Sequence, residues 1–182
     1  TQTRSARGRA AFSESPGRIS RRKYDPNQFA DAAPVARWIS EHTADTDRVA
    51  VLGSEPEILF LSGRRSASKY LFTNFFNERH GKKEEMEREM IGELDAAEPA
   101  VIVMVNHGFS WGAKPDTSWP VIRWAAGRLA AEYELAGTAA PVSWDSSRIV
   151  WEAEARRDSG AAAAPIVIYR RLRAGEGPPP PR

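Results

Sequence analysis

The sequence predicts an α/β protein, a three-layer sandwich with a mainly parallel sheet, helices on both faces and an antiparallel edge. Two observations favour this class. Amphipathic helical patterns alternate with short apolar segments, as in chains built from strand and helix units. One apolar segment, residues 100–105, has no polar side chain, which is typical of a central parallel strand covered on both faces.

The first half of the core predicts two helices and two strands. Apolar residues at helical spacing predict a helix over 27–42. Residues 48–52 then form a short buried strand. Ser54 caps a short helix over 55–61, because a serine oxygen accepts from first-turn N–H groups and because Pro and Glu are favoured at helix starts. Residues 69–73 are rich in β-favouring types and predict a second strand.

The clearest helix lies in the second half, over 82–97, where Met86, Met90 and Leu94 recur four residues apart between charged positions. The apolar strand over 100–105 follows, and a further helix covers 118–133. The remaining apolar segments predict strands at the edge of the sheet, over 134–144, 148–153 and 166–170.

Charge divides the 182 residues into three parts. Residues 1–23 carry seven Arg and Lys against one Glu, with Ser and Gly between them, which predicts a basic disordered linker or a segment that contacts an anionic surface. Residues 24–172 form a single α/β domain, and its acidic balance argues against nucleic acid as a partner. Residues 173–182, rich in Gly and Pro, predict a disordered tail.

Composition excludes several classes of site and topology. The chain has no Cys, so disulfides, thiolate nucleophiles and zinc-thiolate sites are absent. Its longest run of aliphatic residues and Met, 101–105, is far below the roughly 20 residues that span a bilayer, so this piece is expected to be soluble. Thr1 in place of Met indicates a fragment or a processed product.

Cofactor and metal sites are not expected. The three His residues, His42, His80 and His107, are far apart in sequence, and no spacing typical of a metal site occurs. Neither of the two familiar glycine-rich nucleotide loops is present. We therefore predict no metal and no cofactor.

One hydrolase motif is present. Residues 108–112 read Gly-Phe-Ser-Trp-Gly, a G-x-S-x-G directly after the apolar strand, where a nucleophile elbow would lie. The elbow needs a helix that begins at Ser110 and a His later in the chain, and no His follows it. A serine hydrolase using Ser110 is therefore a disfavoured alternative.

The segment from Gly53 to Tyr70 carries the candidate binding residues. Arginine suits bidentate contacts with carboxylate or phosphate, so the loop after the short helix could bind an anion. A structural ion pair that ties down the loop is the competing interpretation for either arginine. The candidates are Glu55, Arg64, Arg65, Ser66, Lys69 and Tyr70.

The same segment carries a family resemblance. A strand, Gly-Ser-Glu-Pro, a short helix, Gly-Arg-Arg-Ser-Ala and a Tyr-containing strand follow one another. This order resembles the soluble C-terminal region of C-fold membrane glycosyltransferases, such as dolichyl-phosphate-mannose protein mannosyltransferases and undecaprenyl-linked aminoarabinose transferases. The resemblance covers about 25–140. The chain departs from it at 59–61 and 73–76, where the family is rich in tyrosine.

The resemblance implies a parent enzyme with many membrane helices, which transfers a hexosyl or pentosyl group from a polyprenyl-phosphate donor on the outer face of a membrane. The catalytic acid would lie in an early extracytoplasmic loop outside this chain. This chain would be a non-catalytic extracytoplasmic domain, attached to the membrane, that assists acceptor positioning or access. Its partners would be the membrane-embedded portion of the same polypeptide and the lipid-linked sugar or the acceptor.

Two alternatives to this function stay open. One is a standalone α/β module that binds phosphate or a sugar phosphate through Arg64, Arg65 and Lys69. The other is the hydrolase that uses Ser110.

Overall fold

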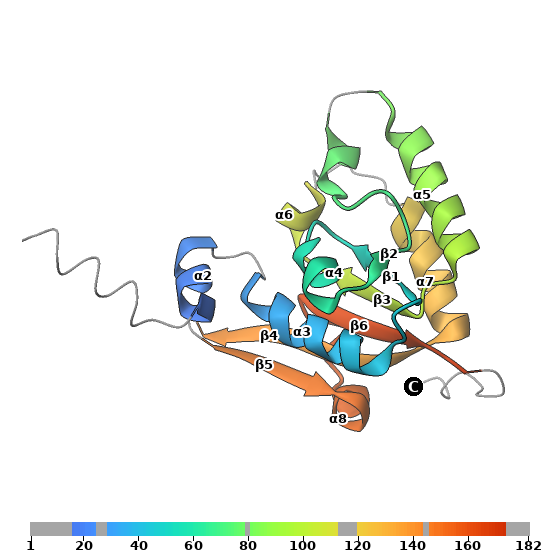
Figure 1. The fold of residues 1–182 in the computed structure, drawn as a ribbon. Helices are drawn as coiled ribbons and strands as arrows, with labels where there is room; N and C mark the ends of the chain where they lie inside the picture. Colours follow the sequence, from blue (N-terminus) through green and yellow to red (C-terminus); the bar gives the residue numbers. More distant parts are fainter. Residues whose placement is uncertain (1–15, 25–28, 79–80, 113–119, 144–145, 174–182) are drawn as a thin grey trace, which may run out of the picture.

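The computed structural model describes residues 16–24, 29–78, 81–112, 120–143 and 146–173. A six-stranded mixed sheet runs through the domain in the order β2-β1-β3-β6-β4-β5 (Figure 1). The strands are β1 (Arg48–Leu52), β2 (Arg65–Ser66), β3 (Val101–Val105), β4 (Tyr133–Ser143), β5 (Ser146–Trp151) and β6 (Ile166–Arg171).

Parallel pairing is confined to one half of this sheet. β1 pairs in parallel with both β2 and β3, whereas β3 with β6, β6 with β4, and β4 with β5 pair antiparallel. The expected antiparallel edge is confirmed, but parallel pairs do not predominate among the described strands. The expectation that 166–170 lies at an edge is wrong, because β6 returns from the β5 edge and pairs between β3 and β4. Its first three residues are accordingly buried.

Two of the described helices precede β1, and helices lie in the connections between most of the later strands. The longest are α3 and α5, and they lie in the N-terminal and central parts of the chain. The helices are α2 (Pro16–Tyr24), α3 (Phe29–His42), α4 (Glu57–Ser62), α5 (Lys83–Ala97), α6 (Gly108–Trp111), α7 (Pro120–Glu132) and α8 (Glu152–Arg157), with 3-10 turns η1 (Asn74–Asn77) and η2 (Ala161–Ala163).

Two hydrophobic clusters use alternate residues of the central strand. Val101, Val103 and Val105 belong to a cluster that includes side chains of α3 and α4. Ile102 and Met104 belong to a second cluster with side chains of α5 and α7. Since successive side chains of a strand point to opposite faces, helices pack on both sides of β3. All five β3 residues are buried, as predicted for a central strand.

The structure corrects three local expectations. Ser54 does not cap α4, which begins at Glu57 after Pro56 and has no side-chain cap, because the Ser54 hydroxyl is bonded to other loops. The strand predicted over 69–73 is absent, and the pairing segment is β2, a few residues earlier. The strand predicted over 148–153 ends at Trp151, where α8 begins.

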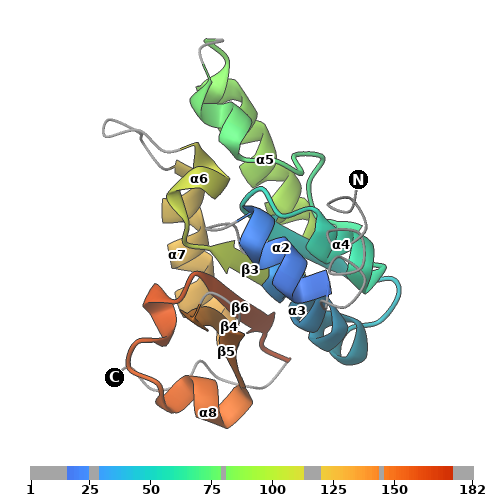
Figure 2. The same cartoon turned by 90° about the vertical axis from the view of Figure 1, so that its left-hand side faces the viewer.

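The segment predicted as a disordered linker contains a helix. α2 covers Pro16–Tyr24 and packs against α3, as Figure 2 also shows from the side. The predicted linker over 1–15 and the predicted tail over 174–182 lie outside the described residues. No described helix is both long and apolar enough to cross a membrane.

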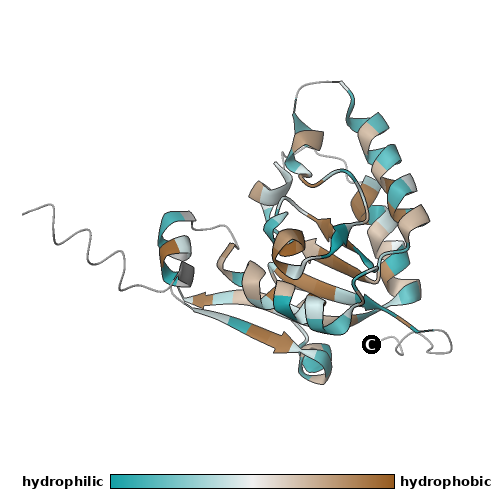
Figure 3. Ribbon diagram, in the orientation of Figure 1, coloured by the Kyte–Doolittle hydropathy of each residue, from teal (hydrophilic) through white to brown (hydrophobic). Residues whose placement is uncertain are grey.

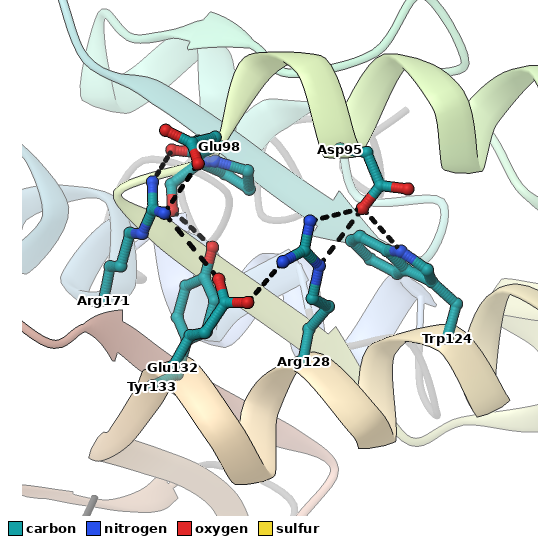
Figure 4. Close-up of polar contacts among 8 residues, drawn as sticks. Asp95, Glu98, Trp124, Arg128, Glu132, Tyr133 and Arg171 are labelled. Atoms are coloured by element: carbon teal, nitrogen blue, oxygen red, sulfur yellow. Dashed lines mark hydrogen bonds and ion pairs between the residues drawn. The ribbon is translucent and has the colours of Figure 1, made fainter. Parts of the chain in front are cut away.

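A network of ion pairs joins the elements at the amino end of β3 (Figure 4). Arg128 of α7 binds Asp95 of α5 at 2.6 Å and also pairs with Glu132. Arg171, at the end of β6, binds Glu98 at 2.8 Å. The Tyr133 hydroxyl donates to the carbonyl of Pro99. These contacts tie α5, α7 and β6 together near the C-terminal end of α5.

Candidate functional site

An open hollow of about 1120 Å³ lies beside the edge strand β2. Pro56, Leu59 and Phe60 of the α4 region form one wall, and Glu93, Ala96 and Ala97 of α5 form another. The predicted binding residues that line it are Arg64, Arg65, Ser66 and Lys69. The hollow therefore combines apolar side chains with three arginines, one lysine and the carboxylate of Glu93.

Arg64 is a structural residue at the floor of this region. Its side chain is 8% exposed and its guanidinium donates to the carbonyls of Ser40, Thr43 and Ser62 and to the Thr43 hydroxyl. It also contacts the exposed Asp45 carboxylate at 3.0 Å. Arg64 thus satisfies carbonyls at the C-terminus of α3, which is where a cation is favoured. Its donors are used within the fold.

Arg65 differs from Arg64 in its exposure and in its contacts. Its side chain is exposed, and no hydrogen bond or ion pair holds it within the described part of the chain. Arg48 lies opposite Arg65 in the β1–β2 register and donates to the carbonyl of Ser66. Lys69 pairs with Glu89 of α5 at 2.5 Å. Arg65 is therefore the cation that could meet a ligand without breaking an existing contact.

Tyr70 does not line the hollow. Its hydroxyl donates to Glu89 at 2.5 Å, and its ring packs edge-on against Phe76. Glu93 accepts from the hydroxyl of Ser68 and from the N–H of Lys69. These bonds fix the segment after β2 onto α5, so that Tyr70 positions the wall of the hollow from outside it.

Glu55 lies at a second location, where the loops after β1 and β3 meet. Its carboxylate accepts from the Ser110 hydroxyl at 2.8 Å and from the N–H of Ser54 at 2.7 Å. Glu55 is 6% exposed, and burial raises the pKa of its carboxyl, while the bonds from Ser110 and Ser54 counteract part of that rise. Glu55 is therefore not among the residues that line the hollow.

Ser54 completes this buried node. Its hydroxyl donates to the Ser110 carbonyl at 2.5 Å and accepts from the N–H groups of Thr73 and Asn74. The loops that follow β1 and β3 and the segment that leads into η1 are therefore joined at one point. This point lies at the carboxyl ends of parallel strands, where α/β proteins usually place ligands, but here the polar groups bind one another.

Ser110 has the environment of a structural serine. It is 5% exposed, and its hydroxyl both donates to Glu55 and accepts from the Ser54 N–H. The short helix α6 begins at Gly108, before Ser110, and ends at Gly112 in the left-handed conformation. A nucleophile elbow instead exposes its serine at a helix start, so the geometry gives little support to the hydrolase alternative.

Sequence reasoning missed three contributors to these sites. Arg48 and Glu93 line the hollow. Arg48 reaches it through the pairing register of β1 with β2, and Glu93 through the position of α5 beside the sheet edge. Thr73 belongs to the buried node, yet its segment was expected to be a strand. The sequence signal for the node is the Ser-Glu pair after a buried strand, a pattern that also fits a helix cap.

Comparison with known protein families, with curated proteins and with solved structures found no match. Within the described ranges, no three His, Cys, Asp or Glu side chains gather as a metal site would require.

Glu57 provides a test of the electrostatics around α4. Burial, with a smaller contribution from the nearby Glu55, raises the pKa of its carboxyl from 4.5 to about 7. The folded state then binds a proton more tightly than the unfolded state, so stability falls as the pH rises through this interval. We expect Glu57→Gln to raise the free energy of unfolding by about 1–2 kcal/mol at about pH 8, after allowance for solvent screening.

Near pH 4.5 the same substitution is expected to change stability little, because the carboxyl is already largely protonated in the fold. Urea unfolding at both pH values measures the difference. Glu84→Gln is the control, since Glu84 is an exposed carboxylate in the first turn of α5. An effect of Glu57→Gln that is equal at both pH values would contradict the burial of this charge.

Proposed function

We propose that this chain is the non-catalytic extracytoplasmic domain of a membrane glycosyltransferase that uses a polyprenyl-phosphate-linked sugar, and that it assists acceptor positioning or access. The observation that carries the proposal is how the resembling segment folds. Gly-Ser-Glu-Pro, α4 and Gly-Arg-Arg-Ser-Ala follow one another in the fold, and the part of this segment from Pro56 to Ala67 lines one side of the hollow. We further propose the three-layer arrangement, supported by the helices on both sides of β3.

The side-chain chemistry at the site supports a binding role over a catalytic one. Glu55 and Ser110, the groups best suited to acid–base or nucleophilic work, are buried against each other. Arg65 faces outward beside apolar residues. In the proposed parent enzyme, the catalytic acid lies elsewhere, and the partners are the membrane-embedded portion and the lipid-linked sugar or acceptor.

The direct test is to read the gene upstream of the codon for Thr1. We expect a long reading frame with many apolar segments of about 20 residues, each able to span a bilayer. A start codon immediately before Thr1 would contradict the glycosyltransferase proposal.

A standalone module that binds phosphate or a sugar phosphate is the second candidate, favoured by the exposed guanidinium of Arg65 in the hollow. Inorganic phosphate at several times its Kd would then stabilise the chain by about 1 kcal/mol. We expect the thermal midpoint to rise by about 2–4 °C. Arg65→Ala should abolish this rise, whereas Arg37→Ala, which removes an exposed arginine of α3, should keep it. If phosphate still raised the thermal midpoint of Arg65→Ala, the hollow would not be the phosphate site.

A further inference from the structure

Exposed hydrophobic side chains gather on one side of the molecule. We define the apolar strip as Phe60, Leu61, Leu71, Phe72, Phe75 and Phe109, all of which are exposed. Phe60 and Phe109 protrude furthest, with 85% and 74% of their surface accessible. Among the large hydrophobic side chains exposed in the described ranges, Val142 of β4 is the one outside the strip. A gathering of this kind marks an interaction surface.

The residues of the strip come from four segments, several of which are neighbours in the fold. Phe60 and Leu71 line the same hollow. The rings of Phe72 and Phe75 meet edge-on with centroids 6.0 Å apart. The turn η1, which holds Phe75, packs against α6, which holds Phe109. Figure 3 shows the hydrophobic colouring on α4, η1 and α6.

Cations and carboxylates both face solvent around the strip, with Glu93 in the hollow and exposed Glu85 and Glu89 on α5, which packs against η1. Arg65 opens into the hollow next to Phe60. The basic helix α2 has exposed side chains at Arg18, Arg22 and Lys23 and no acidic residue. In Figure 2, α2 and α6 are seen on the same side of the molecule. The carboxylate of Glu55 points into the fold instead, and Glu78 is the exposed acidic residue that follows η1.

We infer that the apolar strip inserts into the interface of an anionic lipid bilayer, with Arg65 and α2 near the headgroups. Single aromatic rings that protrude from several short elements suit a lipid bilayer, because a fluid surface does not have to be complementary in shape to the protein. A protein partner would instead need a close-packed complementary core. Apolar side chains at the acyl boundary combined with cations at anionic headgroups are the two contributions that hold interfacial proteins on membranes.

The apolar strip would be the surface by which the proposed membrane-attached domain faces the lipid. A soluble domain without a membrane-spanning parent could carry the same strip. Vesicle binding and the upstream gene sequence can therefore fail independently of each other.

The test is co-sedimentation of the 182-residue chain with phosphatidylcholine vesicles that contain either no phosphatidylglycerol or about one-third of it, at about 0.1 M salt. We expect binding to the anionic vesicles. The double variant Phe60→Ser/Phe109→Ser should lower the partition coefficient at least about tenfold, because two large apolar side chains no longer enter the interface. The control Val142→Ser removes a side chain that is 64% exposed outside the strip and should leave binding unchanged.

Two results would overturn the inference. The first is an absence of binding to anionic vesicles. The second is binding that the double variant retains in full, since the basic segments alone would then account for it. Sedimentation equilibrium without vesicles adds a third decisive result: if the wild-type chain is a dimer and Phe60→Ser/Phe109→Ser is a monomer, a second copy of the chain covers the strip.

Discussion

Arg64→Ala is expected to lower the free energy of unfolding by about 3 kcal/mol. The substitution leaves the carbonyls of Ser40, Thr43 and Ser62 without the guanidinium that now donates to them. The side chain is almost fully buried, so water cannot replace every one of these bonds. Urea unfolding followed by circular dichroism measures the loss.

Two neighbouring substitutions serve as controls for Arg64→Ala. Arg65→Ala removes an exposed side chain and should change stability by less than about 0.5 kcal/mol. Asp45→Ala should do the same, because its carboxylate is 95% exposed and exposed ion pairs contribute little. If Arg65→Ala destabilised the chain as much as Arg64→Ala, the separation of a structural and a free arginine would be wrong.

Gly53→Ala is the second substitution with a large expected effect. A Cβ atom at this position would lie 2.3 Å from Glu55 Oε2, 2.8 Å from the Ser110 hydroxyl and 2.8 Å from the Cβ of Val105. The Glu55 carboxylate is held by two hydrogen bonds, and Val105 belongs to the central strand, so neither can move freely. We expect a loss of about 3 kcal/mol in unfolding free energy, at the upper end of overpacking effects.

Gly92→Ala is the matched control for Gly53→Ala. Nothing lies within 4 Å of a Cβ placed at Gly92, in the middle of α5. Alanine is the better helix former, so this substitution should stabilise the chain by about 0.5–1 kcal/mol. Thermal unfolding of the two variants side by side distinguishes crowding at the buried node from a general cost of replacing glycine. A stable Gly53→Ala variant would show that the node can relax.

The two arginines show where sequence reasoning about the site ended. For either arginine of the Gly-Arg-Arg-Ser-Ala segment, the sequence leaves open whether the side chain ties the loop down or binds an anion. The choice depends on the C-terminus of α3, which lies about 20 residues earlier in the chain and meets Arg64 through carbonyls that no side-chain pattern reveals.

Ser110 and Ser54 illustrate the same limit. Each was assigned to a local role, as a candidate nucleophile and as a helix cap. Each is instead bonded to the loop that holds the other, 56 positions away in the sequence. Local patterns describe what a hydroxyl could do within its own turn, and they do not include a partner brought in by sheet pairing.

The sequence by itself determined the α/β class, the helices α3, α5 and α7, and the strands β1 and β3. Those features follow from the periodic spacing of apolar residues, which can be recognised within a short stretch of the sequence. Only the tertiary structure decided that β6 lies beside β3, that β2 is the edge strand, that Arg64 is internal and Arg65 external, and that exposed aromatic rings form one strip. These features depend on contacts between distant segments, whose energies come from register and packing, and no local pattern encodes them.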